Sequence, residues 1–362
     1  MGSTINFVTL NVRSVANQVK RNSIFQWLNE KHKGIYFLQE THSIPQSIDM
    51  WQKESNSKFF CSHGSTNSKG VAIVIPNSYS FEQHSIKTDG NGRIVILHAT
   101  ILGEELVLAN VYFPTKDFQK DQCNTLTNLL EMLSDYVGKS LIIGGDFNIA
   151  LDLDLDKHGG RRDTNESKQF RLELNAFLDS QLLIDQLRCK NPDKHLFTWY
   201  SKHLKVSSRL DYFFISEHLS NRIIKCNISP SILTDHRLVQ ITLQLNKDQT
   251  RGAGYWKFNT NLLHDKEYIK LVTNIIEKIK LDMHACHNKG LVWDVMKMHI
   301  RGETIKYCTY KNKKQKELEN RLTQEITELS IKHSNKPDHA LLEKIDSIKC
   351  ENISKNYYHS KS

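Results

Sequence analysis

Short apolar runs that end in polar residues recur along the first 245 residues of the chain. The clearest is Leu141–Ile149, where an apolar run precedes two glycines and then Asp146, Phe147 and Asn148. Such a run is typical of a buried strand, and we expect the glycines to end it. If the backbone stays extended, Asp146 and Asn148 point to one side while Phe147 packs on the other. An ordinary Asp/Asn turn after a strand would explain the same residues.

Strands and helices alternate from the start of the chain. Residues 5–12 alternate apolar and polar side chains and predict a strand, and residues 35–38 predict a second one followed by Glu40. Between them, residues 17–32 place apolar side chains at helical spacing. This strand–helix–strand order predicts an α/β fold, in which functional sites lie at strand ends.

Further elements fill the rest of this region. We expect strands at 70–75, 93–100, 106–112, 197–200, 210–215 and 238–243, and helices at 118–137 and 166–185. The spacing of Asp152, Asp154 and Asp156 is that of a calcium-binding loop, but no glutamate stands at the twelfth loop position. We therefore interpret these aspartates as part of an ordinary loop.

The pattern changes after residue 245. Residues 246–254 contain the Gly252-Ala253-Gly254 stretch and predict a linker between domain 1–245 and an extension at 255–362. The extension has helical periodicity, and residues 306–332 are rich in Lys, Gln and Glu, which favours a long exposed helix.

Composition limits the class of protein. The chain has 362 residues, of which 39% are hydrophobic and 25% charged, as in a globular protein of about two domains. It has no apolar run of membrane-spanning length and no secretory signal, so we expect no membrane association. Seven scattered cysteines without a Cys-x-x-Cys pair favour a reducing compartment, the nucleus and cytoplasm, over a disulfide framework or a zinc site.

The positive charge is concentrated in the C-terminal part. The net charge is +9; residues 251–362 hold 21 Lys+Arg and 14 Asp+Glu (+7), and the first 250 residues hold 28 and 26 (+2). A basic extension indicates a polyanionic partner. Taken alone, the charge favours an ordinary lysine-rich solvated helix face.

The predicted strand ends carry carboxylates, amides, a tyrosine and one histidine. These residues are Asn11, Glu40, Tyr112, Asp146, Asn148, Asp211, Asp235 and His236. Carboxylate and amide oxygens are the ligands that Mg²⁺ prefers, with Mn²⁺ as the alternative. Phosphodiester hydrolysis needs a metal to neutralise phosphate charge, an activated water and a stabilised leaving oxygen, and this set can supply all three. Taken alone, an aspartate at a strand end more often belongs to a cap or a turn, and a lone histidine is more often structural.

The order of these stretches resembles the endonuclease/exonuclease/phosphatase superfamily, and most of all the endonuclease domain of LINE-type non-LTR retrotransposons. The resemblance is carried by Thr9-Leu10-Asn11, Gln39-Glu40-Thr41-His42, Asn110-Val111-Tyr112, Gly145-Asp146-Phe147-Asn148, Arg209-Leu210-Asp211-Tyr212 and Asp235-His236. It covers about residues 4–245 and continues more weakly through Tyr255–Asn259 and around Trp293 and Arg301. It implies a four-layered α/β sandwich of two packed mixed β-sheets flanked by helices, followed by a mostly helical extension.

The resemblance also implies a metal site and a hydrolytic site. Glu40 would be the main metal ligand, with Asn11 beside it and Asp235 contributing. Asp146 would orient or deprotonate the attacking water, or protonate the leaving oxygen. Asn148 would hold the same water or the phosphate.

Further roles follow from the same resemblance. Asp211 would fix the tautomer of His236, which would contact the scissile phosphate, and Tyr112 would contact the phosphate or assist the leaving group. DNA contacts would come from Thr198 and from a basic hairpin with Lys202, Lys205 and Arg209. A solvated hairpin tip explains such basic residues equally well. Thr234 stands where the family usually has Ser, and we expect this change to be tolerated because the hydroxyl is kept.

The implied function is a Mg²⁺-dependent endonuclease that nicks one strand of duplex DNA, leaving a 3′-hydroxyl that primes reverse transcription and a 5′-phosphate. Element RNA is a further expected partner, through the basic extension. Three alternatives remain: an abasic-site repair endonuclease, a small-molecule phosphoesterase of the same superfamily, and a non-catalytic nucleic-acid-binding remnant. The sequence predicts neither a target site nor an oligomeric state.

Overall fold

A computed structural model describes residues 4–115, 119–160, 163–201, 204–231, 233–245, 258–285, 288–335 and 338–359. The chain divides into two compact units: Met1–Thr250 with Thr327–Ile353, and Arg251–Ile326 with Ser354–Ser362. The first stretch ends close to residue 245, where the sequence pattern changes. Residues 327–353 also belong to the first unit. The expected linker at 246–254 lies outside the described residues.

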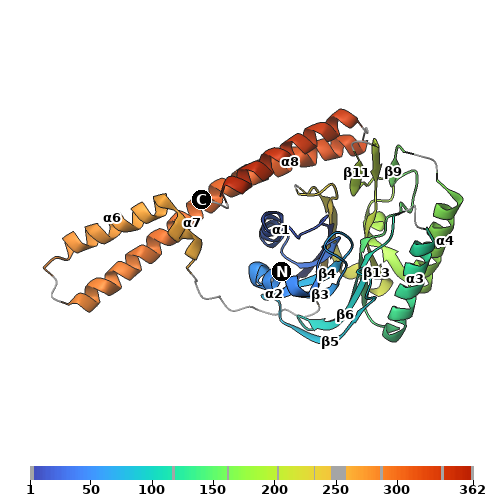
Figure 1. Ribbon diagram of the computed structural model, residues 1–362, viewed down its shortest axis with the longest axis horizontal. Coiled ribbons are helices and arrows are strands. Elements are labelled where there is room, and N and C mark those ends of the chain that lie inside the picture. Colours follow the sequence, from blue (N-terminus) through green and yellow to red (C-terminus); the bar gives the residue numbers. More distant parts are fainter. Residues whose placement is uncertain are drawn as a thin grey trace. The chain divides into compact units, whose positions relative to one another are not determined.

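Two six-stranded mixed sheets form the centre of the first unit (Figure 1). The strands of one sheet lie in the order β14 (Ile223–Ser229), β15 (Leu238–Gln244), β1 (Thr4–Asn11), β2 (Ile35–Gln39), β4 (Val71–Pro76) and β3 (Ser57–Ser62). Those of the other lie in the order β10 (Leu183–Asp185), β13 (Asp211–Ser216), β8 (Leu141–Asp146), β7 (Glu104–Tyr112), β6 (Ile94–Ile101) and β5 (Phe81–Thr88). A third, small sheet joins β11 (Trp199–Ser201), β12 (Val206–Ser208) and β9 (Lys157–His158).

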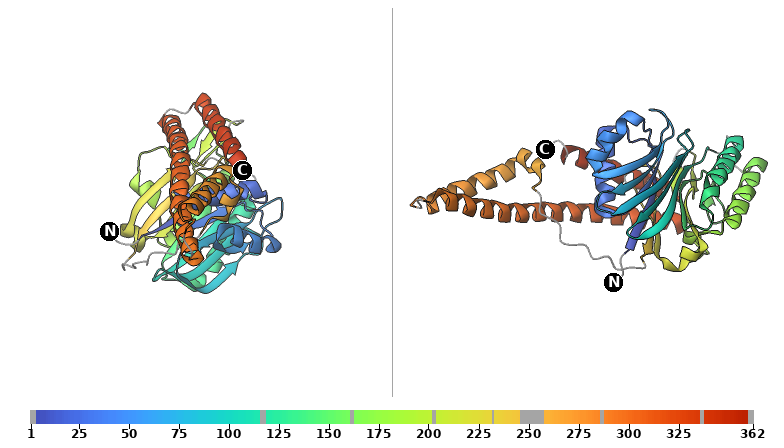
Figure 2. Two further views of the ribbon diagram at one scale, coloured as in Figure 1. Left: turned by 90° about the vertical axis from the view of Figure 1, so that its left-hand side faces the viewer. Right: turned by 90° about the horizontal axis from the view of Figure 1, so that it is seen from below.

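Helices cover the outer face of each large sheet (Figure 2). These are α1 (Gln18–Lys31) and α2 (Ile48–Ser55) on one side, and α3 (Gln119–Leu133) and α4 (Asn165–Ser180) on the other, with the short α5 (Gln186–Lys190) beside β13 and β14. Along β1, Phe7 packs between the sheets while its neighbour Val8 faces the helical side. Along β8, Ile142 and Ile143 alternate in the same way. The alternation produces three apolar layers, and the predicted four-layered sandwich is confirmed.

The strand β8 contains its two glycines instead of ending at them. A Cβ atom on Gly144 would lie 2.4 Å from Cε1 of Phe213, and one on Gly145 would lie 2.0 Å from the carbonyl oxygen of Val111. Glycine therefore lets β13 and β7 approach β8 closely from both sides. The strand continues to Asp146, which corrects the expectation that the glycines end it.

The backbone leaves the extended conformation just after this strand. Asn148 has a φ of 51°, in the left-handed region that Asn tolerates better than most residues. Its amide N–H donates to Oδ1 of Asp146 at 3.0 Å. Asp146 and Asn148 therefore meet across a tight turn, and not as alternate positions of one extended strand, while Phe147 is buried as expected.

The C-terminal part of the chain is helical, as predicted. It contains α6 (Lys266–Asp282), α7 (Lys289–Asn335) and α8 (His339–His359). Within the second unit, Asp265 caps α6 and forms an ion pair with Lys311 of α7. The hydroxyls of Tyr268 and Thr304 lie 2.6 Å apart between the same two helices. Over the described residues, no helix combines the length and the apolar character needed to span a bilayer.

Candidate functional site

The ends of five strands bring the predicted polar residues together. In the parallel pair β1–β2, Asn11 is level with Gln39, so Glu40 follows one residue beyond it. In the parallel pair β7–β8, Tyr112 is level with Asp146. The antiparallel strand β13 begins at Asp211, which also pairs with Asp146. The registers of the two sheets therefore assemble the site.

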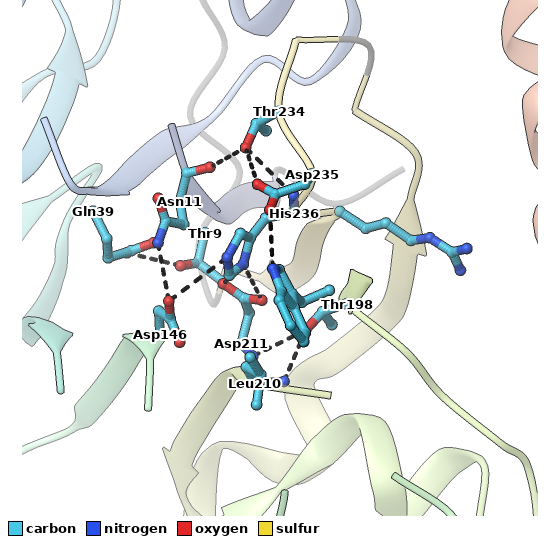
Figure 3. Close-up of polar contacts among 12 residues, drawn as sticks. Thr9, Asn11, Gln39, Asp146, Thr198, Leu210, Asp211, Thr234, Asp235 and His236 are labelled. Carbon is cyan, nitrogen blue, oxygen red and sulfur yellow. Dashed lines mark hydrogen bonds and ion pairs between the residues drawn. The ribbon is translucent and has the colours of Figure 1, made fainter. Parts of the chain in front are cut away.

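Asn11 connects the two sheets at this edge (Figure 3). Its side-chain amide donates to Oε1 of Glu40 at 2.8 Å and to Oδ2 of Asp146 at 2.9 Å. Asn11 and Asp146 are buried, with at most 1% of either residue exposed. Two carboxylates thus face each other across one neutral amide, and this concentration of negative charge and oxygen donors fits a divalent cation.

A buried Asp–His pair lies next to these carboxylates. Nδ1 of His236 lies 2.9 Å from Oδ2 of Asp211, and Nε2 lies 3.9 Å from Oδ2 of Asp146. The hydroxyl of Thr198 accepts hydrogen bonds from the backbone N–H groups of Leu210 and Asp211 at 2.9 and 3.1 Å. Thr198 therefore positions the start of β13, and with it the carboxylate that holds the imidazole.

The protonation states follow from this arrangement. Burial alone would lower the pKa of His236, but the carboxylate of Asp211, followed by Asp146, raises it to about 9. Burial raises the pKa of Asp146 to about 7, the charge of Asp211 adds to the rise, and His236 opposes it. Near neutral pH the site therefore pairs a cationic imidazole with a carboxyl group that can gain or lose a proton.

Potential metal-ligand atoms of Asp146, Asp211 and His236 lie within 4.8 Å of one another. Protonated His236, however, cannot coordinate a metal through its ring nitrogens. A cation therefore fits better between the carboxylates of Glu40 and Asp146, where Asn11 would have to turn its amide oxygen towards the ion, because its Nδ2 faces both carboxylates.

Asp235, which the sequence suggested as a further metal ligand, has other partners. Its Oδ2 accepts hydrogen bonds from Nη1 of Arg13 at 2.8 Å and from Nε1 of Trp199 at 3.0 Å. The neighbouring Thr234 hydroxyl donates to the carbonyl oxygen of Asn11 at 3.0 Å. The hydroxyl expected to be kept at this position thus ties the Thr234–His236 loop to β1.

Tyr112 and Asn148 complete the predicted set. Burial, and then the charges of Glu40 and Asp146, raise the pKa of the Tyr112 hydroxyl, which keeps its proton. The side-chain amide of Asn148 donates to the carbonyl oxygen of Phe113 at 2.8 Å. Tyr112 can therefore donate a proton or a hydrogen bond, while the amide of Asn148 is fixed beside Asp146.

The predicted DNA-contacting residues divide into exposed and buried ones. Lys205 is exposed at the tip of the β11–β12 hairpin, and Lys202 lies outside the described residues. Thr198 is fully buried, so the expectation that it lies against the DNA backbone needs correction. Arg209 is 1% exposed and forms ion pairs with Asp156 at 2.8 Å and Asp185 at 2.6 Å.

This burial also corrects the expectation that Arg209 contacts DNA. Its guanidinium ties the residue that follows β12 to Asp156 and Asp185 and is not available at the surface. Asp156, interpreted above as part of an ordinary loop, is in fact a fully buried partner of Arg209 and of Arg188.

Three basic residues near the site were not predicted. Arg13 binds Asp235, and Nζ of Lys20 donates to the carbonyl oxygen of Arg13 at 2.6 Å. The guanidinium of Arg93 lies 5.4 Å from the centre of the Tyr112 ring. Arg13 could have been found from its place two residues after Asn11, at the tip of β1. Lys20 and Arg93 have no comparable signal in the sequence.

Comparison with known proteins gives matches at the levels of family, sequence and fold. The sequence profile of the Endonuclease/Exonuclease/phosphatase family matches residues 8–236. The chain is 28% identical over 342 residues to the Transposon TX1 uncharacterized 149 kDa protein of Xenopus laevis, which covers 92% of this chain and 25% of that protein. The chain therefore spans only about a quarter of the length of this relative.

Two further matches are nucleases. The chain is 23% identical over 258 residues to an exodeoxyribonuclease of Bacillus subtilis (strain 168), which covers 66% of this chain and 99% of that protein. The crystal structure of AP endonuclease LMAP from Leishmania major aligns with a TM-score of 0.53 at 17% identity. This alignment covers 67% of the present chain and 88% of the other, and it shows a shared fold.

Proposed function

We propose that this chain, which belongs to the Endonuclease/Exonuclease/phosphatase family, is a divalent-metal-dependent endonuclease. It would nick one strand of duplex DNA. The products would be a 3′-hydroxyl and a 5′-phosphate. The observation that carries the proposal is the buried group of Asp146, Asp211 and His236 beside Glu40 and Asn11. The nuclease relatives support DNA as the substrate class.

Glu40 and Asn11, beside Asp146, would hold Mg²⁺, with Mn²⁺ as the alternative. A bound cation supplies positive charge that neutralises the scissile phosphate. Oδ2 of Asp235 would have to release Arg13 before it could bind a metal, since Arg13 and the metal ion would compete for the same oxygen. We therefore assign Asp235 a supporting role, in which it orients Trp199 and Arg13.

Asp146 is the residue we assign to proton transfer. With a pKa raised to about 7 by burial and by Asp211, it can accept a proton from an attacking water near neutral pH. Asn148, bound to Asp146 through its backbone N–H, would hold that water or the phosphate. Tyr112 keeps its hydroxyl proton and would donate a hydrogen bond to the phosphate or the leaving oxygen.

His236 would bind the scissile phosphate as a cation. Asp211 holds Nδ1, so Nε2 is the nitrogen that can donate to a phosphate oxygen. The pairing fixes the ring and keeps it charged, and a fixed charge stabilises negative charge that develops during the reaction.

A plasmid-nicking assay tests this function. Wild type, Asp146→Ala and His236→Ala would be incubated with supercoiled plasmid and Mg²⁺, with Glu131→Gln on the exposed face of α3 as the control. Wild type and Glu131→Gln should nick, and each site variant should lose about 10²-fold or more of the rate. DNA ligase should reseal the nicks, since it needs a 3′-hydroxyl and a 5′-phosphate. A folded wild-type protein that leaves the plasmid supercoiled would overturn the proposal.

An abasic-site endonuclease is the second candidate, because the fold matches that of an AP endonuclease. A matched pair of short duplexes, one intact and one with a single abasic site, separates the two functions. Equal nicking of both duplexes favours the proposed function. Cutting confined to the abasic duplex favours repair.

The similarity to the TX1 protein supports a role in transposition. In that role the 3′-hydroxyl of the nick would prime reverse transcription of element RNA. The chain would then act as one part of a longer protein, in line with the quarter of the TX1 protein that it spans. We place such an activity in the nucleus, after synthesis in the cytoplasm.

A further inference from the structure

The C-terminal segment Thr327–Ile353 belongs to the same compact unit as the active site. We propose that this segment selects the DNA target, by clamping the β11–β12 hairpin and the Thr234–His236 loop in one arrangement. The inference rests on the proposed function, because it concerns how DNA meets that site. Two anchors, one on α8 and one near the end of α7, carry it.

Lys349 of α8 is the first anchor. It is 7% exposed, and its ammonium donates to Oη of Tyr200 at 2.7 Å and to the carbonyl oxygen of Thr234 at 3.1 Å. The Tyr200 hydroxyl in turn donates to Oδ1 of Asp346, one turn earlier on α8, at 2.7 Å. One buried lysine thus joins α8, strand β11 and a residue two positions before His236.

His333, near the end of α7, is the second anchor. It is 3% exposed, and its Nε2 lies 2.8 Å from Oγ of Ser207 on β12. Its ring also lies 6.2 Å from that of Phe197, just before β11. The two anchors therefore hold both strands of the hairpin, and Figure 1 shows α8 and the end of α7 beside β11.

The β11–β12 hairpin lies outside both six-stranded sheets, and in the described residues the strand it pairs with is the two-residue β9. On its other side it reaches the active site, because Trp199 donates to Asp235 and forms a backbone bridge with His236. A shift of the hairpin would therefore move Asp235 and His236.

The contacts lie at the base of the hairpin, and the tip residues that the structure describes, Leu204 and Lys205, are exposed. Tyr200 and Ser207 at the base are buried. Burying an ammonium group is costly unless its hydrogen bonds are satisfied, so the contacts of Lys349 favour a single arrangement. A tip held at a fixed angle to the catalytic residues can discriminate between DNA sequences by groove width and deformability.

Hydrogen exchange and nick-site sequencing on the full chain test this clamp. The variant Lys349→Met keeps the length of the side chain and removes its donors, and Lys344→Met, on the exposed face of α8, is the matched control. In Lys349→Met, amides of β11 and β12 should exchange about tenfold faster while those of β8 are unchanged. Nicks should spread over more plasmid sites, with the share at the preferred sites falling about threefold.

Three results would overturn the proposal. One is unchanged exchange in the hairpin together with an unchanged set of nick sites. Another is faster nicking at the same sites, which would mean that the segment covers the site and does not select its target. The third is a wild-type protein that nicks no plasmid, which would overturn both target selection and the proposed function. In that case the exchange rates still show whether the segment clamps the hairpin. If Lys349→Met does not fold, Tyr200→Phe removes one hydroxyl at the same junction and should give the same two effects.

Discussion

Among the carboxylates near His236, the buried Asp211 contributes most to keeping its imidazole charged. Asp211 is fully buried and 2.9 Å from Nδ1, and its charge and hydrogen bond, together with the charges of Asp146 and Asp235, outweigh the effect of burial on the pKa of His236. Because the folded-state pKa of about 9 exceeds the ordinary value of 6.5, protonation stabilises the fold. This contribution is complete below pH 6.5 and is lost as the pH rises through about 9.

The variant Asp211→Asn should lower the pKa of His236 from about 9 to near or below 6.5, since burial then dominates. An NMR titration of the imidazole nitrogens in cation-free protein measures the change. The loss of stability between pH 6.5 and 9 should become smaller in the same variant. Asp179→Asn, at an exposed position on α4, should behave as wild type. A pKa that stays near 9 in Asp211→Asn would show that another group keeps the imidazole charged.

Arg209 is expected to stabilise the fold instead of binding DNA. The variant Arg209→Met leaves the carboxylates of Asp156 and Asp185 without this partner, and breaking a buried pair costs about 3–5 kcal/mol. Urea denaturation should show a loss of that size in the free energy of unfolding. Lys205→Met at the exposed hairpin tip should change it by less than about 0.5 kcal/mol. Unchanged stability with weaker DNA binding in Arg209→Met would restore the surface role first expected of it.

Among the secondary-structure elements, β8 packs closely against both of its neighbouring strands. It lies between β7 and β13, and the ring of Phe213 occupies the space that a side chain at Gly144 would take. Gly144→Ala should lower the free energy of unfolding by about 1–3 kcal/mol, because the core must shift to accept one carbon. Thermal or urea denaturation measures the loss. Gly302→Ala in α7, where a Cβ meets nothing within 4 Å, should be neutral or stabilising. Equal midpoints for Gly144→Ala and wild type would contradict the packing argument.

The polar residues beside the strands could be predicted from sequence because their signal is local: a polar residue next to an apolar run. The order of these motifs also implied the contact between Asp211 and His236, which the structure contains. The burial of Arg209 could not be predicted, since it depends on Asp156, which lies 53 positions away in the chain. The hydrogen bond from Lys349 to Thr234, 115 positions apart, could not be predicted either. Helical periodicity does not show which part of the protein a helix face contacts.

The excess positive charge and the proposed catalytic residues lie in different parts of the chain. Residues 251–362 carry +7 of the net +9, whereas the proposed catalytic residues lie before residue 237. In α7, Lys313 and Lys314 are exposed. We expect this part to bind nucleic acid weakly through phosphate contacts, which release counterions and so depend strongly on salt.

Binding of single-stranded RNA to the full chain, measured by fluorescence anisotropy over a series of salt concentrations, tests this expectation. Each lost phosphate contact should reduce the slope of log K against log salt by about 0.7, so Lys313→Gln with Lys314→Gln should reduce it by about 1.4. Lys58→Gln with Lys225→Gln removes the same charge from exposed strand positions of the first unit and is the control. If both double variants lower the slope equally, the binding reflects net charge alone. An affinity that does not change with salt, or no binding at low salt, would exclude a phosphate-binding role for the extension.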